Sequence, residues 1–231
     1  MNEAWLLAGV RTPIGKFLGA FTDVPATELG AVVLRESLRH AGIDAAAVDE
    51  VILGNVISAG LGQAPARQAA LKAGLPPTVA ALTVNKVCGS GLKAVMLASQ
   101  AVRLGEAQII LAGGIENMSQ APHLARGLRI GVKMGGLSLD DAMIHDGLWC
   151  AFDDCHMGVH AESTAEAHGI TREDLDRFAL ESQQRASRAS AAGAFREEIV
   201  PVPVRRKREE ILVSADEGPR PETTAESLAK L

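Results

Sequence analysis

Short apolar runs alternate with longer amphipathic stretches along the first half of the chain. The runs are rich in aliphatic and β-branched residues and are bounded by Gly, Asn or charged residues, which is typical of buried strands. They lie at 51–56, 81–84 and 108–112, and helical stretches lie at 65–73 and 89–104. This alternation predicts an α/β fold over residues 1–114, with helices packed in layers around a largely parallel sheet.

A further helix is predicted at 27–41, before the first strand. Leu29, Val32, Val33 and Leu38 fall on one broad face of this segment. Gly42 follows directly, and glycine readily adopts the left-handed conformation that ends many helices. The segment is therefore expected to be an amphipathic helix with one buried face.

The regular pattern is lost from 113 to 160, where Gly, Met, His and Pro are frequent. Loops of this length in compact domains are usually functional. Thr171 and Asp174 then form the pattern of a capping box, which predicts a helix that runs to about 192, before Gly193. We expect residues 115–231 to form a loop domain attached to the α/β core.

The tail from residue 199 holds two short β-like runs around a charged segment and ends inside an apparent helix at Leu231. The charged segment is Arg205-Arg206-Lys207-Arg208-Glu209-Glu210.

Length, charge and cysteine content narrow the class of protein. A chain of 231 residues with 47% apolar side chains can bury a full core. Its net charge of -5, with basic residues scattered until Arg205, argues against nucleic-acid binding. Three cysteines leave at least one free thiol, which favours a reducing compartment, so we expect a cytoplasmic protein. We find no signal peptide and no membrane-spanning window.

A thiol stands where a predicted strand turns into a predicted helix. Val84 ends the strand, and Cys88 precedes Gly89 and Gly91 at the start of the helix. The unpaired N–H groups and the dipole of a helix N-terminus stabilise a thiolate, so Cys88 is expected to be nucleophilic. The same N–H groups can hold the oxygen of a carbonyl under attack. Without these neighbours, Cys88 would be interpreted as a small buried apolar residue.

Four blocks of sequence, in order, resemble the thiolase family. The nucleophile signature of that family is matched by Asn85-x-x-Cys88-Gly89-Ser90-Gly91, followed by Ala94 and Val95. The other three blocks are Arg11-Thr12-Pro13-Ile14-Gly15-Lys16-Phe17, Gly113-Gly114-Ile115-Glu116-Asn117-Met118-Ser119 and His156-Met157-Gly158. The resemblance covers the chain from Arg11 to Leu231.

The resemblance implies the N-terminal half of a thiolase-like fold, with a mixed, mainly parallel sheet between helices and an inserted loop domain. It also implies that Cys88 takes an acyl group from acyl-CoA as a covalent thioester. CoA thioesters are then the substrates, and no cofactor or metal is required. By the same resemblance, the acyl and pantetheine pocket is lined by Leu148, His156 and Met157, and CoA is met by Arg220, Ser227 and Leu231.

His156 favours acetyl-CoA and acetoacetyl-CoA as substrates, because relatives that cleave long chains tend to lack this His, and Met157 is expected to limit acyl length. The leading hypothesis is therefore an acetyl-CoA C-acetyltransferase that condenses two acetyl-CoA to acetoacetyl-CoA and catalyses the reverse thiolysis. One alternative is a broader-chain 3-ketoacyl-CoA thiolase of β-oxidation. Another is a non-catalytic half-thiolase subunit, against which the intact motif around Cys88 argues.

Other polar clusters have simpler interpretations. Glu116 and Asn117 are expected to fix their loop and a neighbouring subunit rather than to catalyse. The basic run at 205–208 fits CoA phosphates and a solvated surface equally well. No metal site is expected, because the spacing of five candidate ligands fits no zinc pattern. Those five are Cys150, Cys155, His145, His156 and His160.

The third block departs from the usual family form, which has Tyr at the position of Cys155, Thr at that of His160 and Asn at that of Ser163. The second half of a thiolase, which supplies a His base, a second Cys and an Asn, does not occur in this sequence. We therefore expect the chain alone not to turn over. Its expected partners are acyl-CoA, a C-terminal thiolase half that would cover an exposed apolar face, and further copies in a dimer or tetramer.

Overall fold

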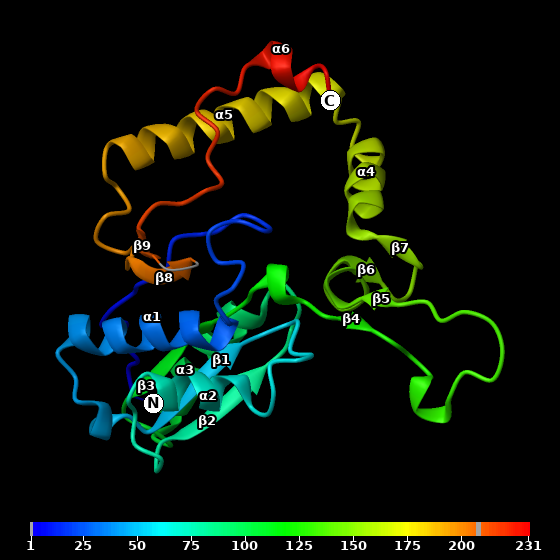
Figure 1. Ribbon diagram of the computed structural model, residues 1–231. Coiled ribbons are helices and arrows are strands. Elements are labelled where there is room, and N and C mark those ends of the chain that lie inside the picture. Colours follow the sequence, from blue (N-terminus) through cyan, green and yellow to red (C-terminus); the bar gives the residue numbers. More distant parts are fainter. Residues whose placement is uncertain (1, 207–208) are drawn as a thin grey trace.

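A computed structural model describes residues 2–206 and 209–231, and its first half is a layered α/β unit (Figure 1). Along this half the elements alternate between helix and strand. They are α1 (Ala26–Ala41), η1 (Ala45–Ala47), β1 (Glu50–Gly54), α2 (Pro65–Lys72), β2 (Ala80–Val84), α3 (Ser90–Leu104) and β3 (Ile110–Gly114).

The strands form a parallel sheet in the order β2-β1-β3, with β1 in the centre. Successive side chains of a strand point to opposite faces, and β1 is buried on both. Val51 and Leu53 belong to the apolar cluster with α1 and α2, whereas Ile52 packs with Ala94 and Ala98 of α3. The sheet therefore lies between α1 and α2 on one face and α3 on the other, which confirms the predicted fold class.

The predicted elements occur with boundaries shifted by a few residues. The expected strand at 108–112 begins only at Ile110, because the N–H groups of Gln108 and Ile109 donate to Oδ2 of Asp49 at 2.7 and 3.0 Å. The expected strand at 51–56 ends at Gly54. The N–H of Asn55 still bonds to the carbonyl of Val84, but the N–H of Val56 turns to the carboxylate of Glu116 at 2.8 Å.

The second half begins with short elements and continues with two longer helices (Figure 1). The short elements are η2 (Met118–Gln120), β4 (His123–Leu124), η3 (Leu128–Ile130), β5 (Asp140–Asp141), η4 (Met143–Leu148, a π-helix), β6 (Trp149–Cys150) and β7 (Cys155–His156). They are followed by α4 (Met157–Ala167), α5 (Arg172–Ala191), β8 (Val202–Arg206), β9 (Glu209–Val213) and α6 (Ala225–Leu228).

The predicted capping box and hairpin strands are confirmed. Thr171 Oγ1 accepts the N–H of Asp174 at 3.2 Å, and the Asp174 carboxylate accepts the N–H of Thr171 at 3.2 Å. The expectation of a helix reaching Leu231 was wrong, because α6 ends at Leu228 and Leu231 follows in a turn bonded to the Leu228 carbonyl. Among the described residues, no helix is both long and apolar enough to cross a membrane.

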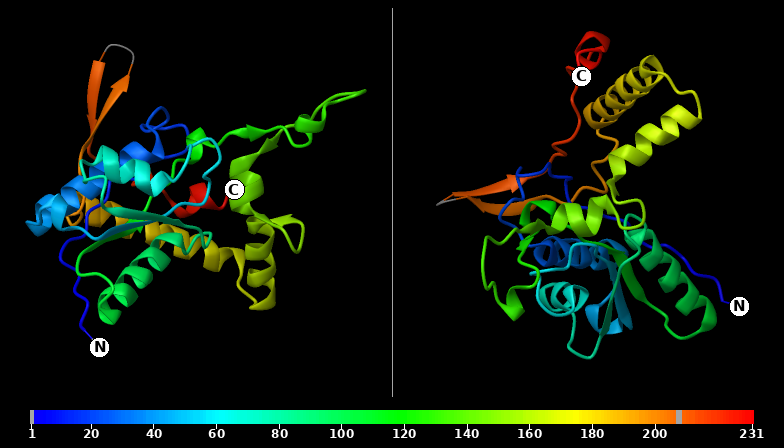
Figure 2. Two further views of the ribbon diagram at one scale, coloured as in Figure 1. Left: turned by 90° about the horizontal axis from the view of Figure 1, so that it is seen from below. Right: turned by 90° about the vertical axis from the view of Figure 1, so that its right-hand side faces the viewer.

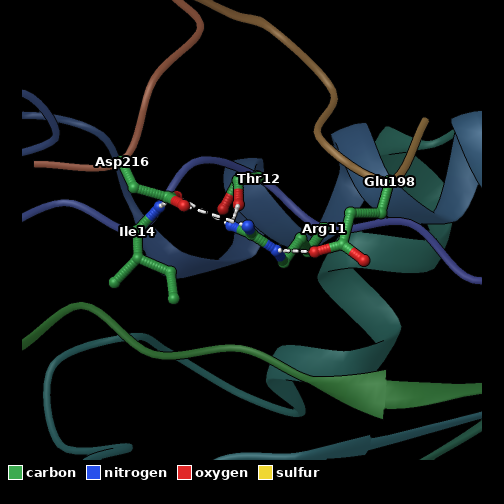
Figure 3. Close-up of polar contacts among 5 residues, drawn as sticks. All are labelled: Arg11, Thr12, Ile14, Glu198 and Asp216. Atoms are coloured by element: carbon green, nitrogen blue, oxygen red, sulfur yellow. Dashed lines mark hydrogen bonds and ion pairs between the residues drawn. The ribbon is translucent and has the colours of Figure 1, made fainter. Parts of the chain in front are cut away.

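The antiparallel hairpin of β8 and β9 returns to the first half of the chain. Val202 and Val204 are buried against Phe21 and Leu29, at α1 and the loop before it. Arg11 lies nearby between Glu198 and Asp216 (Figure 3). The segment between β4 and β5 projects from the body of the molecule (Figure 2). The tail is thus anchored on the α/β unit, and the division at 114 stays a prediction.

Apolar side chains are also exposed near one edge of the sheet. Leu82 of β2 is 42% exposed, and Leu92 of α3 is 68% exposed. Exposed apolar residues are normal singly, and a group of them marks a contact surface. Trp5, Leu6 and Leu7 of the N-terminal segment are exposed as well.

Candidate active site

The carboxyl ends of the three parallel strands meet at one edge of the sheet, where ligands of open α/β sheets usually bind. A side-chain carbon on Gly54, the last residue of β1, would lie 2.5 Å from the carbonyl carbon of Ser90 and 2.6 Å from the nitrogen of Gly91. Such a distance is impossible, so glycine is required here. The end of β1 therefore touches the first turn of α3, directly beside Cys88.

The turn between β2 and α3 is held by its own hydrogen bonds. Val87 donates its N–H to Oδ1 of Asn85 at 2.8 Å, and Lys86 donates its N–H to Oγ of Ser90 at 2.8 Å. Oγ of Ser90 in turn donates to the carbonyl of Val87 at 2.6 Å. Val87 has φ of +47°, which is strained for a β-branched residue. The turn is thus fixed in an uncommon conformation that presents the next residue, Cys88.

Cys88 is a free, exposed thiol, and it lines a cavity of about 370 Å³. Leu148, at the end of the π-helix η4, lines the same cavity, as do Met118 and Glu116. The structure therefore brings together Cys88 and Leu148, two of the residues that the sequence placed in the acyl site. η4 reaches the cavity because Gly147 leaves its backbone close to Ile57, whose Cδ1 would lie 3.0 Å from an added side chain.

Two of the N–H groups expected to hold a carbonyl oxygen are already used within the turn. The N–H of Gly89 donates to the carbonyl of Lys86 at 3.1 Å, and that of Ser90 donates to the carbonyl of Val87 at 3.0 Å. Gly91, the next residue of the first helical turn, lines the cavity together with Cys88. Its N–H group is the candidate donor at this end of α3.

Glu116 follows β3 and binds the loop that follows β1. Its carboxylate accepts the N–H of Val56 at 2.8 Å, the N–H of Ile57 at 3.3 Å and Nδ2 of Asn55 at 2.9 Å. Desolvation raises the pKa of Glu116, and these hydrogen bonds oppose the rise. The contacts are those of a residue that fixes its loop.

Asn117 has a similar role on the other side of the loop. Its Nδ2 donates to the carbonyls of Phe21 at 2.8 Å and Val24 at 2.7 Å, and its Oδ1 accepts the N–H of Ser119 at 3.0 Å. These contacts join the loop after β3 to the segment before α1.

Asn55 was missed by the sequence analysis. It lines the Cys88 cavity, is 2% exposed, and has no hydrogen-bond partner for Oδ1 among the described residues. The sequence held a signal, because Asn55 is a polar residue near the end of the strand predicted at 51–56, and the carboxyl ends of parallel strands meet at one edge of a sheet.

His156 and Met157 lie at the junction of β7 and α4. Nδ1 of His156 accepts the N–H of Gly158 at 3.0 Å and so caps α4. Met157 is 39% exposed. Neither residue is among those that line the Cys88 cavity, although His156 pairs with Trp149, the neighbour of Leu148. The structure thus places them near the site without bringing them to the thiol.

The residues expected to meet CoA lie on α6 or in the segments before and after it, and none of them lines the Cys88 cavity. Helix α6 packs along α5, away from α3 (Figure 1). Arg220 donates its backbone N–H to Oε1 of Gln183 on α5 at 2.8 Å. Ser227 forms a capping box with Thr224, and its Oγ donates to the Thr224 carbonyl at 2.8 Å. Leu231 is 88% exposed. The contacts of Ser227 are those of a helix cap.

The basic run is only partly described, because Lys207 and Arg208 lie outside the described residues. Nη2 of Arg206 donates to the carbonyl of Gly19 at 3.3 Å, which ties β8 to the loop before α1. Arg205 is exposed.

Residues 5–231 match the family of thiolase N-terminal domains. Over its whole length the chain is 55% identical to the acetyl-CoA acetyltransferase of Pseudomonas aeruginosa. It is 53% identical to a probable acetyl-CoA acyltransferase of Staphylococcus epidermidis and 50% identical to a probable acetyl-CoA acetyltransferase of Escherichia coli K12, again over its whole length. In each case the chain spans 59% of the relative.

The fold and the site agree with this match. The fold is a parallel sheet between helices, and the site has a cysteine on a strained turn at the carboxyl edge of the sheet. The chain belongs to the thiolase family.

Proposed function

We propose that Cys88 accepts an acyl group from an acyl-CoA, as the first step of acyl transfer between CoA thioesters. One observation carries the proposal: Cys88 is exposed on a preorganised turn and lines an open cavity at the carboxyl edge of the sheet. An ordinary buried structural cysteine needs neither the exposure nor the strained turn. The names of the bacterial relatives support the same chemistry.

In the proposed first step, the sulfur of Cys88 attacks the thioester carbonyl carbon and the bond from that carbon to the CoA sulfur breaks. CoA leaves as a thiolate and takes up the proton that Cys88 gave up. The thioester of CoA is thus replaced by a thioester of Cys88. In the second step, a carbanion from acetyl-CoA attacks the acyl group and Cys88 leaves. Two acetyl-CoA then give acetoacetyl-CoA and CoA, and thiolysis is the reverse.

The proton acceptor for Cys88 comes from outside the described residues that line its cavity. None of those residues is a histidine, and the Glu116 carboxylate is occupied by the N–H groups of Val56 and Ile57. Nucleophilic catalysis by a thiol needs such a base. We therefore propose that turnover requires a C-terminal portion like that of the longer relatives, and that this portion covers the apolar side chains Leu82 and Leu92.

The substrate assignment rests on the resemblance at His156. Leu148 borders the cavity of about 370 Å³ beside Cys88, where the acyl group would lie. We propose that His156 and Met157 close this pocket around acetyl-CoA when the complete site forms, and that Arg220, Ser227 and Leu231 meet the rest of CoA. Dimers or tetramers, cytoplasmic location and a role in fatty acid metabolism belong to the same proposal.

Isotope exchange tests the proposal, because exchange between acetyl-CoA and labelled CoA needs only the first step. The chain is combined with the C-terminal portion of a longer relative, and label transfer is measured without further acceptor. We expect exchange in the wild type and a loss of at least about a thousandfold in Cys88→Ser. Exchange that survives Cys88→Ser contradicts the proposal.

Thiolysis of substrates of increasing chain length distinguishes the two hypotheses in which the protein is an enzyme. Preference for the C4 substrate supports an acetyl-CoA C-acetyltransferase, and equal or faster thiolysis of longer substrates supports a broader 3-ketoacyl-CoA thiolase. Absence of exchange in the combined protein supports a non-catalytic subunit.

A further inference from the structure

Four side chains that acyl transfer does not use gather on the hairpin of β6 and β7 and the first turns of α4. They are Cys150, Asp153, Cys155 and His160. The ligand atoms of Cys150, Asp153 and His160 all lie within 4.8 Å of one another. Sγ of Cys155 lies 3.6 Å from Nε2 of His160, but it does not lie within 4.8 Å of all three of these atoms.

The backbone explains why these side chains converge. Cys150 and Cys155 are directly opposed in the antiparallel pair of β6 and β7. The turn between the strands brings Asp153 back, and its N–H donates to Sγ of Cys150 at 3.4 Å. Helix α4 begins right after the hairpin, which places His160 over the two strands. The spacing Cys-x₂-Asp-x-Cys-x₄-His is unlike the usual zinc motifs, so the sequence alone predicts no metal site here.

The distances suit a tetrahedral metal ion. Zinc bonds of about 2.3 Å to sulfur and about 2.0 Å to nitrogen or oxygen imply ligand-to-ligand separations of about 3.3 to 3.8 Å. Oδ2 of Asp153 lies 3.3 Å from Nε2 of His160 and 3.4 Å from Sγ of Cys150, and Cys155 to His160 is 3.6 Å. These three pairs are held at nearly the separations that an ion requires, and Cys155 joins the other donors after a change of its side-chain position.

We propose that Cys150, Asp153, Cys155 and His160 bind one divalent transition metal ion of the zinc class. Two sulfurs, one imidazole nitrogen and one carboxylate oxygen are donors that zinc accepts, and they fill a tetrahedral shell once Cys155 turns toward the other three. The ion displaces the protons of the two thiols. Because all four positions come from the protein, the ion has a structural role and ties β6, β7 and α4 together. The proposal does not rest on acyl transfer.

Titration with Co²⁺ tests the site without any activity measurement. The full chain is reduced with a phosphine, and tetrahedral Co²⁺ with thiolate ligands gives charge-transfer and visible bands. We expect bands that saturate at one ion per chain and that disappear when Zn²⁺ is added. Cys150→Ser and His160→Gln should each weaken binding by at least about tenfold.

Two variants outside the cluster control for other ligands. Cys88→Ser removes an exposed thiol, and His145→Gln removes a histidine that pairs with Asp146 instead. Both should bind Co²⁺ like the wild type. The proposal is overturned if the wild-type chain gives no bands, if the bands survive both Cys150→Ser and His160→Gln, or if either control loses them. The proposal is also overturned if Cys150 and Cys155 form a disulfide in air and added metal does not prevent it. The disulfide is detected as the loss of two hydrogens in the intact mass.

Discussion

Arg11 and Asp216 are joined by two parallel hydrogen bonds across 205 positions of the chain (Figure 3). Nη1 and Nη2 of Arg11 lie 2.7 and 2.9 Å from the two carboxylate oxygens, and Nε of the same residue lies 2.7 Å from Oε1 of Glu198. The guanidinium also lies over the ring of Phe195. This fork fixes the N-terminal block to the tail that follows α5.

Replacing Arg11 by Lys should destabilise the fold, because the ammonium keeps the charge and loses the paired geometry. We expect the free energy of unfolding to fall by about 2 kcal/mol, as for other charge-assisted hydrogen bonds. Urea denaturation measures the change. Arg39→Lys, at an exposed pair with Glu36, is the matched control and should change stability by less than about 0.5 kcal/mol. Equal effects at the two positions would contradict this role of Arg11.

The pair also predicts a dependence on pH. Hydrogen bonds from Arg11 hold the pKa of Asp216 below its usual range. A carboxyl group with a lowered folded-state pKa contributes stability that is present above its unfolded pKa and is lost as pH falls through the folded pKa. Denaturation curves from neutral to acid pH should therefore show a smaller loss of stability in Asp216→Asn than in the wild type. A steeper acid loss in the variant would argue against the pair.

Gly54 should tolerate no side chain. A methyl group there meets the backbone of Ser90 and Gly91 at 2.5 to 2.6 Å, so Gly54→Ala should cost about 2 kcal/mol of unfolding free energy. Gly113→Ala in β3 is the control, because its methyl group meets only Cδ2 of Leu53 at 3.9 Å. Urea denaturation of both variants checks the contrast, and a similar cost for the two would show that the close approach is not rigid.

Much of the α/β unit was predictable, because its signals are local. The strands are short apolar runs between helices, and the capping box at Thr171 lies within four residues. The place of Cys88 between β2 and α3 was predictable for the same reason. The pairing of Arg11 with Asp216 was not, since no periodicity links residues so far apart.

The surroundings of Cys88 were predictable only in part. Leu148 was expected in the acyl site from the resemblance, but its position depends on a π-helix, which no simple periodicity indicates. The cluster around Cys150 and His160 depends on a tight hairpin between strands of two residues each. Such short strands carry no alternation that could have been detected.

Glu116 predicts a pH effect of the opposite sign to Asp216. Desolvation raises its folded-state pKa, so its contribution to stability is greatest below the unfolded pKa and is lost as pH rises through the folded value. Compared with Glu116→Gln, the wild type should gain stability as pH falls from the folded-state pKa of Glu116 toward its unfolded pKa, by at most about 1.4 kcal/mol per pH unit. Chemical denaturation at several pH values measures this difference.

Glu106→Gln, on the exposed surface after α3, is the control for Glu116→Gln and should change stability by less than about 0.5 kcal/mol. If the stability of the wild type relative to Glu116→Gln increases as pH rises, the raised folded-state pKa of Glu116 is contradicted.

Val87 should be replaceable by glycine at little cost. Its left-handed conformation costs on the order of 1 to 3 kcal/mol, which offsets the roughly 1 kcal/mol of backbone entropy that glycine loses on folding. Val87→Gly should therefore match or exceed the wild type in urea stability. Val51→Gly, fully buried in β1, is the contrast and should lose several kcal/mol. A large loss at Val87 would mean that the turn is not strained.

The covalent thioester on Cys88 tests the central claim most directly. The chain is incubated with acetyl-CoA, alone and with the C-terminal portion of a longer relative, and its peptides are analysed by mass spectrometry. We expect an acetyl group on Cys88 in the combined sample, little or none in the chain alone, and none on Cys150 or Cys155 in either. Fast acetylation of the isolated chain would contradict the need for an external base, and a combined sample that turns over without acetyl-Cys88 would contradict the account itself.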